Sequence, residues 1–427
     1  MNIKTVVKHP LFKSSLIYAV SDGVNKAIPF FILPVLSYYL LPSDYGIVAN
    51  FGVLSSIISI LIGVGVAAAI SVNYYKFTKE ELSKYIFNAL LIILLAAIIV
   101  LVAVTVFNQI IFLYVKVPFQ YQLLVVVMAL ATVITSINLS LWRLEEKPIK
   151  FGIYTISQTA VNISISLLLI IVYKLGWVGR VNGILISSVL FGGLSIFILY
   201  RRGYLQINFN KRILTNILVF GLPLIPHSLS FWMRSGVDLI FITRFIGEKA
   251  TGLYATGFVF GTLIAFMTGS FNNAFVPYMY KMLSVDDDTV LKNNKRKLVK
   301  MVYLGIVGLV ILCIIFTGIS NFILDNFFAD KYAGSSKFIF WAILSQTFQG
   351  MYLFFVNYIF FSKKTKLLAV ITFFCAGLQV ILSYIMIQKI GSIGAAYATV
   401  IVSFINFIAI AYYSNKVYRM PWLGGKI

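Results

Sequence analysis

The sequence predicts an all-α integral membrane protein with twelve transmembrane helices. Of its 427 residues, 60% are hydrophobic and only 11% are charged, and the mean hydropathy is +0.95. Soluble globular domains carry about 25% charged residues. A spanning helix needs about 20 consecutive apolar residues, and runs of that length recur throughout the chain. The ten-residue alternation of an outer-membrane barrel is not seen.

Twelve apolar segments can be assigned along the chain, and each is long enough to be a span or to form most of one. They centre on residues 13–40, 45–72, 85–113, 120–142, 150–173, 180–200, 213–243, 250–277, 298–324, 337–361, 367–388 and 392–413.

The basic residues of the connecting segments predict the orientation. Counted from a cytoplasmic N-terminus, one set of connections holds 25 Lys and Arg residues and the opposite set holds 8. This asymmetry is the positive-inside pattern, so we expect both termini in the cytoplasm of a bacterium and the chain in its inner membrane. Lys26 and Arg234 are the remaining two of the 35 basic residues and lie inside spans.

Most of the net charge of +22 therefore reflects topology and does not indicate a nucleic-acid partner, which would need a basic face on a folded soluble domain. The 281–300 connection is the most basic, and contact with anionic lipid is an alternative to a simple orientation signal there. The two cysteines, Cys313 and Cys375, fall in apolar runs and predict neither a disulfide nor a metal site.

The chain also looks duplicated. The segment DYGIVA at 44–49 recurs as ATGLYA at 250–255, an offset of 206, and each copy follows a long span that contains prolines. Because each half would hold six spans, the halves share one orientation and are related by an axis along the membrane normal. We predict two six-helix lobes, residues 1–208 and 209–427.

The seventh span, within 217–246, is the most unusual stretch. It contains Arg234 and Asp238, and the first span contains Asp22 and Lys26. A charge at the centre of a spanning helix costs roughly 2.5–3.5 kcal/mol on insertion scales. Residues four apart share one helix face, so each acid can pair with the base beside it. At 1.5 Å per residue, all four lie within roughly 10 Å of the predicted midplane.

Two interpretations of these charges remain open. In the first, each pair neutralises itself and only holds its helix in the bundle. In the second, which we favour, the pairs line a central cavity, where the bases bind an anionic substrate and the acids bind a coupling ion, Na⁺ or H⁺. Arg234 is the first candidate for substrate binding because its planar guanidinium can bind phosphate oxygens bidentately, and Lys26 is the second.

Other polar residues are weaker candidates. His227 lies two helical turns before Arg234 and is a candidate proton carrier, although a lone histidine in a span more often serves only as a hydrogen-bond partner. Arg244, Arg180 and Arg143 lie near helix ends, where snorkelling explains them, and contact with substrate at the mouth of the cavity is the alternative, with Arg244 as the candidate among them. Several amides are expected to join helices or to contact sugar hydroxyls, namely Asn25, Gln158, Asn162, Asn272 and Asn273. The prolines of the first and seventh spans, Pro29, Pro34, Pro223 and Pro226, are expected hinges.

Enzyme signals are weak. Glu145 and Glu146 precede Lys147-Pro148 and look like a solvated turn. Asp286-Asp287-Asp288 is the one acidic cluster, but no His or Cys lies near it, so we predict no metal site. No extramembrane segment exceeds about 20 residues, which argues against a separate catalytic domain and against any cofactor.

The sequence around the seventh span resembles a known family. The run from Phe220 to Ser228, FGLPLIPHS, the run from Asp238 to Ile242, DLIFI, and the run from Gly252 to Ala255, GLYA, are similar to polysaccharide flippases of the O-antigen and capsule type. These are oligosaccharidyl-lipid exporters of the MATE-like MOP superfamily. Tyr45-Gly46 and the glycines from Gly176 to Gly183 agree with this resemblance.

The resemblance implies two lobes in a V that move an undecaprenyl-diphosphate-linked oligosaccharide to the periplasmic leaflet by alternating access. It implies the lipid-linked glycan and membrane lipids as partners, with glycan polymerase or ligase machinery as a further partner, and we expect a monomer. A MATE-type antiporter of cationic drugs is the alternative, although such a pump favours acids without neighbouring bases. A membrane-embedded polymerase or ligase is opposed by the small outer loops.

Overall fold

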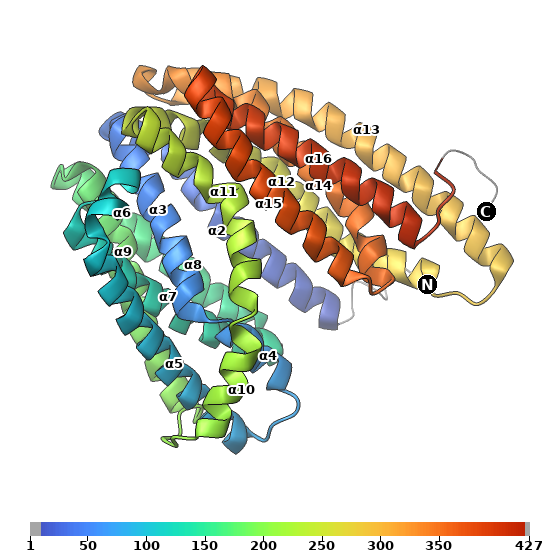
Figure 1. Cartoon of the computed structure of the whole chain (residues 1–427), viewed down its shortest axis with the longest axis horizontal. Coiled ribbons are helices and arrows are strands. Elements are labelled where there is room, and N and C mark those ends of the chain that lie inside the picture. The colour runs from blue at the N-terminus through green and yellow to red at the C-terminus, as the bar shows by residue number, and fades with distance from the viewer. Residues whose placement is uncertain (1–9, 423–427) are drawn as a thin grey trace. The chain divides into compact units, whose positions relative to one another are not determined.

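The computed structural model describes the backbone of residues 10–422, and the side chains from residue 17 onward except at positions 19, 22, 26, 27 and 29. Across this part of the chain every regular element is a helix (Figure 1). The chain divides into two compact units, Met1–Trp232 and Met233–Ile427. The boundary between the units therefore falls within the seventh span. The division into lobes at residue 208 stays a prediction.

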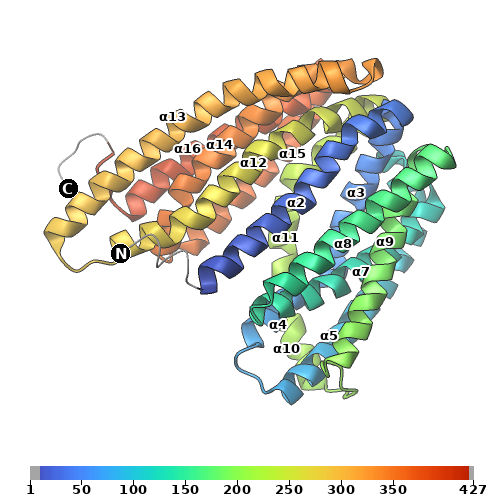
Figure 2. The same cartoon turned by 180° about the vertical axis from the view of Figure 1, so that it is seen from behind.

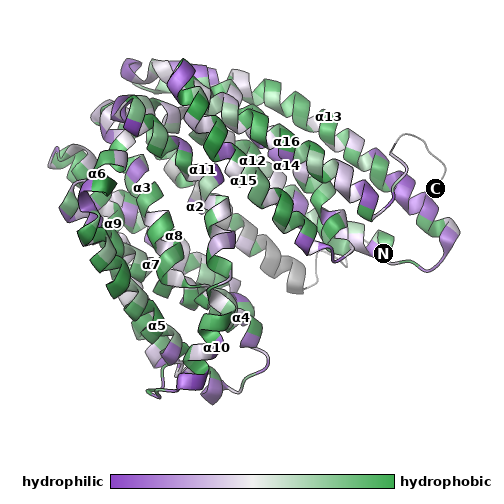
Figure 3. Ribbon diagram, viewed as in Figure 1, coloured by the Kyte–Doolittle hydropathy of each residue, from purple (hydrophilic) through white to green (hydrophobic). Residues whose placement is uncertain are grey.

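Eleven of the twelve predicted membrane spans are confirmed. Among the described residues, eleven helical segments are long and apolar enough to cross a bilayer. The first predicted span, 13–40, lies almost entirely within a further helix, α2 (Pro10–Tyr39). The hydrophobic residues run along the helices, and the hydrophilic residues gather at their ends and in the loops (Figure 3). The chain is a multi-pass membrane protein.

The first unit continues after α2 with long helices and with shorter ones between them. They are α3 (Pro42–Gly63), α4 (Val66–Asn73), α5 (Lys79–Val106), α6 (Asn108–Val115), α7 (Phe119–Leu144), α8 (Pro148–Leu167), the π-helical turn η1 (Leu168–Val172), α9 (Gly176–Arg201) and α10 (Lys211–Gly221). α7 packs on α9, α3 and α5, and α8 packs on α9 and α2 (Figure 2).

Aromatic packing holds α7, α8 and α9 together. Trp142, Tyr154 and Phe191 form a buried cluster in which neighbouring rings meet edge to face at 5.3 and 5.0 Å. Edge-to-face pairs add about 0.5–1.5 kcal/mol to the burial of such rings. Lipid tails are as apolar as hydrophobic side chains, so burial alone does not hold helices together in a membrane. Specific ring packing of this kind therefore sets the positions of α7, α8 and α9.

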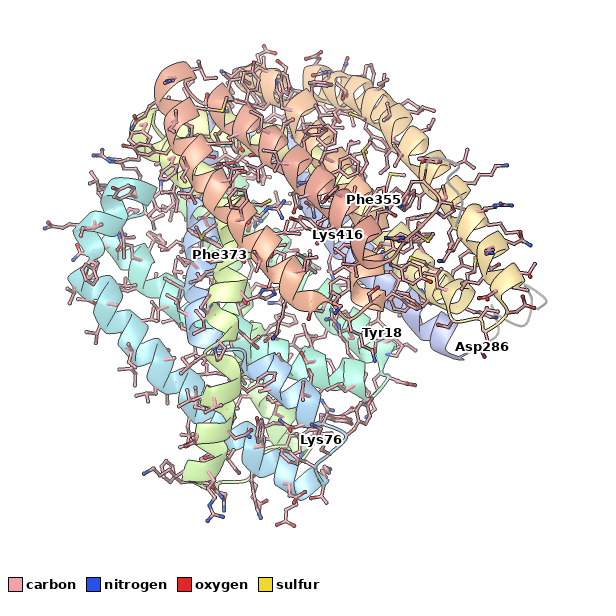
Figure 4. The ribbon with its side chains drawn as sticks, turned by 45° about the vertical axis from the view of Figure 1, so that its right-hand side comes forward. Tyr18, Lys76, Asp286, Phe355, Phe373 and Lys416 are labelled. Carbon is pink, nitrogen blue, oxygen red and sulfur yellow. The ribbon has the colours of Figure 1, made fainter. Side chains whose placement is uncertain are left out.

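The second unit begins within α11 (Leu224–Phe245) and contains α12 (Glu248–Leu283), α13 (Asp288–Phe327), the 3₁₀ turn η2 (Asp330–Ser335), α14 (Ser336–Phe361), α15 (Thr365–Ile390) and α16 (Ile393–Val417). α14 is central and packs on α12, α13 and α16, while α15 packs on α16. Phe355 of α14 lies in the core, whereas Phe373 of α15 is exposed (Figure 4).

The helix boundaries agree with the predicted duplication. α3 begins at Pro42 and α12 begins at Glu248, which is the same offset of 206 that relates the two sequence copies. Gly46 and Gly252, at equivalent places in the copies, are both buried near the starts of these helices. The repeated motif therefore marks the start of the second span of each half.

The prolines of the two unusual spans behave differently. The seventh span is interrupted between Gly221, where α10 ends, and Leu224, where α11 begins, and Pro223 lies in the gap. The first span continues as a single helix past both Pro29 and Pro34. A proline removes one backbone donor, but its neighbours can keep the helix continuous.

Candidate functional site

The seventh span carries its two charges near the middle of α11. Both Arg234 and Asp238 belong to the second unit, where α12, α14, α15 and α16 supply their neighbours. The two side chains turn to different neighbours.

Asp238 is buried, with 3% of its surface exposed. Its Oδ1 accepts hydrogen bonds from Ser383 Oγ at 2.5 Å and from Gln379 Nε2 at 3.1 Å. Its Oδ2 accepts from Thr399 Oγ1 at 2.7 Å, from Tyr254 OH at 3.0 Å and from Gln379 Nε2 at 3.2 Å. The carboxyl group of Asp238 therefore ties α11 to α12, α15 and α16.

All four partners of Asp238 are neutral. Among the described residues, no Lys, Arg or His forms an ion pair with this carboxylate. A buried charge is costly unless it is paired or hydrogen-bonded, and here five neutral donor contacts take the place of a cation. The surrounding oxygens are those of carboxylate, hydroxyl and phenol groups, a set that suits a proton or a hard cation.

Arg234 is half-buried and turns toward α14. Its Nη2 donates to Gln349 Oε1 at 3.1 Å. Within the described part of the chain, no ion pair joins Arg234 to Asp238, so the first of the two open interpretations, a self-neutralising pair, is not seen for these two residues. The physical reason is that hydroxyl, phenol and amide donors already occupy both oxygens of Asp238. Arg234 thus keeps a positive charge that no carboxylate of the described chain neutralises.

The other candidates on α11 lie elsewhere. His227 is exposed, and its ring packs edge to face on Phe231 at 5.1 Å. Its backbone carbonyl accepts from Ser230. Arg244 is exposed in the last turn of α11, where a cation is favoured by the helix dipole. Pro226 is also exposed, in the first turn.

In the first unit, three predicted positions fall outside the described side chains: Asp22, Lys26 and Pro29. Asn25 between them accepts a hydrogen bond from Thr159 Oγ1 at 2.9 Å and so joins α2 to α8. In the second unit, Asn272 accepts from Asn357 Nδ2 at 2.7 Å, which joins α12 to α14. Both amides join helices, which is one of the two roles expected of them.

Arg180 has a different environment from that expected at a helix end. Its Nη1 donates to Asn162 Oδ1 at 2.6 Å and to Ser166 Oγ at 2.7 Å, so the guanidinium is held between α9 and α8. Snorkelling to the membrane surface does not describe this side chain, because its hydrogen bonds lie within the unit.

The sequence did not single out the partners of Asp238. Gln379 and Ser383 are four residues apart in an otherwise apolar span, and this spacing places two polar groups on one helix face. Together with Thr399 on the next span, this pattern indicates a polar cluster within the membrane. Tyr254 belongs to the repeated motif, where the sequence indicates only the duplication and the family resemblance.

The expected solvated turn is wrong for Glu145, whereas Glu146 is exposed as expected. The Glu145 carboxylate forms ion pairs with Arg202 and with Lys147, the latter at 2.7 Å, and it accepts from Tyr204 OH at 2.7 Å. Burial acts to raise the pKa of Glu145, but the hydrogen bonds from Lys147 and Tyr204 and the charge of Arg202 outweigh burial and lower it. This cluster ties the connection after α7 to the connection after α9.

No group of three or more His, Cys, Asp or Glu side chains that could hold a metal is found among the described residues. The acidic run has a structural role at Asp287, whose Oδ1 caps α13 by accepting from the backbone N–H groups of Thr289 and Val290.

Taken together, these features define a multi-pass, all-α membrane protein with a buried acid and a separate cation in the middle of one span. The chain belongs to the polysaccharide biosynthesis protein family, whose family model matches residues 11–283. The resemblance seen in the sequence is therefore confirmed for the family. The chain is 27% identical to the Haemophilus influenzae protein "Lsg locus putative protein 1" over 364 residues, 84% of this chain and 87% of that protein.

Solved structures share the fold. One is a lipid II flippase, MurJ, in an inward closed conformation, with a TM-score of 0.72 and 16% identity over 93% of this chain and 87% of that one. Another is an inward-facing multidrug resistance MATE family transporter of the MOP superfamily, with a TM-score of 0.68 and 14% identity over 96% of both chains. Both neighbours agree with the predicted fold class.

Proposed function

We propose that this protein is a flippase and not an enzyme. It would move an undecaprenyl-diphosphate-linked oligosaccharide, such as an O-antigen or capsule repeat unit, from the cytoplasmic to the periplasmic leaflet of the inner membrane. Family membership and the fold shared with a lipid II flippase support this proposal. Both termini would be cytoplasmic, as the distribution of basic residues predicts.

The observation that carries the proposal is the separation of Arg234 from Asp238. The Arg234 guanidinium lies in mid-span and donates to the neutral amide of Gln349. No carboxylate of the described chain pairs with it, so its charge is available to an anionic ligand. A guanidinium binds the two phosphates of a diphosphate through paired N–H groups. Arg234 is therefore our first substrate-binding residue, with Lys26, Asn25 and Arg244 as further contacts.

Asp238 is suited to a second role, the binding of a coupling ion. A proton or a sodium ion that neutralises the carboxylate would change the hydrogen bonds between α11 and three other helices. Ion binding would then bias the arrangement of these helices, which is the requirement for coupling. Asp22 and His227 remain alternative ion-binding candidates, and the four prolines remain candidate hinges.

The test is deletion of the gene, followed by complementation. We expect loss of surface glycan and accumulation of the lipid-linked oligosaccharide, both reversed by the wild-type gene. Arg234→Ala should restore less than about a tenth of the glycan, since loss of a charged hydrogen bond costs about 1.5–3 kcal/mol. Lys249→Ala is the matched control, because it removes an exposed cation at the start of α12.

The competing function is export of cationic drugs, which the fold shared with a MATE transporter allows. The buried Asp238, which forms no ion pair with a base of the described chain, is the feature that favours this competitor. If deletion left surface glycan intact and raised drug sensitivity, the drug exporter would be the better account. Full complementation by Arg234→Ala, with normal membrane insertion, would reduce Arg234 to a packing role.

A further inference from the structure

A surface pocket of about 330 Å³ opens in the second unit between α13 and the segment that follows α16. Its volume falls within the range of about 300–1,000 Å³ typical of ligand sites. Arg296, Lys300, Tyr303, Leu304 and Val307 line it from α13, and Trp422 lines it from the other side. The proposed transport function does not use this pocket.

The α13 residues form one stripe along the helix. Their spacing of 4, 7, 8 and 11 residues from Arg296 repeats at close to whole turns, so they share a face. At 1.5 Å per residue the stripe is roughly 16 Å long. It passes from two cations through a tyrosine to aliphatic side chains, which is the order of phosphate, glycerol and acyl chain in a phospholipid.

The stripe also lies at the depth of a membrane surface. α13 has 40 residues, far more than the 20 or so that cross the hydrocarbon core, so its first turns extend beyond the bilayer. Tyr and Trp concentrate at membrane interfaces. The rings of Tyr303 and Trp422 are 6.1 Å apart and meet edge to face, and the Tyr303 hydroxyl donates to the Trp422 carbonyl.

The far wall of the pocket is held in place by several contacts. Lys295 Nζ donates to the Arg419 carbonyl at 3.2 Å and lies 4.8 Å from the centre of the Tyr418 ring. The Trp422 ring packs on Phe355 of α14 at 4.9 Å. The pocket is therefore bounded by fixed side chains on two sides.

The charges of the pocket are not neutralised within the described chain. Arg296 and Lys300 are exposed, and neither forms an ion pair with a carboxylate there. Leu304 and Val307, one to two turns further along α13, are 62% and 55% exposed and are therefore open to lipid in a membrane. We propose that this pocket binds one anionic phospholipid, with its phosphate on Arg296 and Lys300 and its acyl chains along Leu304 and Val307.

The test is native mass spectrometry of the purified full chain titrated with phosphatidylglycerol in detergent. Each basic residue at an anionic lipid surface contributes about fivefold to binding. Arg296→Gln and Lys300→Gln should therefore each weaken phosphatidylglycerol binding by about fivefold, and the double variant by about 25-fold. The double variant Lys364→Gln/Lys366→Gln, which removes two exposed cations around the start of α15, should bind as the wild type does.

Two further probes test whether binding needs both the negative charge and the acyl chains of the lipid. Phosphatidylcholine should bind much more weakly than phosphatidylglycerol, because it has no net negative charge. Glycerol phosphate should also bind weakly, because it has no acyl chain. The proposal is overturned if the Arg296/Lys300 variants bind normally, if the control variant loses as much affinity, or if either probe binds as well as phosphatidylglycerol.

Discussion

At the scale of single residues, the buried carboxylate of Asp238 accepts five hydrogen bonds from four neutral side chains. Removing this carboxylate would leave the Tyr254 hydroxyl without its acceptor and the Gln379 amide with fewer acceptors. The Thr399 hydroxyl would keep one, because it also donates to the Ala395 carbonyl of its own helix. An orphaned buried donor costs about 1–3 kcal/mol. The loss of unfolding free energy caused by removing the Asp238 carboxylate therefore depends on how many of its donors still find another acceptor.

We expect Asp238→Ala to lower the free energy of unfolding by about 2–4 kcal/mol and Tyr254→Phe to lower it by about 1 kcal/mol. The double variant should cost less than the sum, because the phenylalanine ring has no hydroxyl that needs an acceptor. Thermal unfolding of the three purified variants in detergent measures this. Strictly additive costs would show that the Tyr254–Asp238 hydrogen bond is not energetically significant.

Glu145 predicts a pH dependence in the first unit. Its pKa in the folded state is lowered, below the value of about 4.3 expected in an unfolded chain. The ionised carboxylate therefore stabilises the fold above that pH, and this stabilisation is lost as the pH falls through the folded-state pKa.

We accordingly expect wild type to melt at a higher temperature than Glu145→Gln at about pH 6, with the difference shrinking below about pH 4. Melting curves in detergent across this range provide the check. Glu146→Gln, at the exposed neighbouring position, is the matched control for the removal of a carboxylate from this turn. A gap between wild type and Glu145→Gln that stays constant with pH would contradict the assignment.

At the scale of elements, two helix interruptions meet in the first unit. α3 and α4 are separated at Val64 and Gly65, both with positive φ, and α10 ends at Gly221. A Cβ placed on Gly221 would lie 1.9 Å from the Val64 carbonyl oxygen, and one on Gly65 would lie 2.9 Å from Leu224 Cδ1. The two interruptions therefore pack through glycine backbone.

Gly221→Ala should lower stability by at least about 2 kcal/mol, because overpacking against backbone forces the helices apart. Gly269→Ala is the matched control, since a Cβ there would meet nothing within 4 Å. The readout is the melting temperature of each purified variant. Equal melting temperatures for the two variants would show that the contact between the interruptions relaxes freely.

At the scale of the whole molecule, the sequence predicted the helices well because each span has its own apolar run. The offset of 206 between repeats also reappears in the starts of α3 and α12.

Side-chain partners were harder to predict. The spacing of Arg234 and Asp238 allowed a pair, but Gln349, Gln379, Ser383 and Thr399 are 115 to 161 residues away in the chain. Only tertiary packing brings such distant groups together, as it does for Glu145 and Arg202.

The most direct test of transport uses the purified protein in liposomes that contain an undecaprenyl-diphosphate oligosaccharide in both leaflets. A glycosidase added outside digests only glycan that reaches the outer leaflet. We predict that wild type and Lys249→Ala make nearly all of the glycan accessible, while Arg234→Ala stays close to empty liposomes. Digestion by wild type no greater than in empty liposomes, or undiminished digestion with Arg234→Ala, would contradict this account.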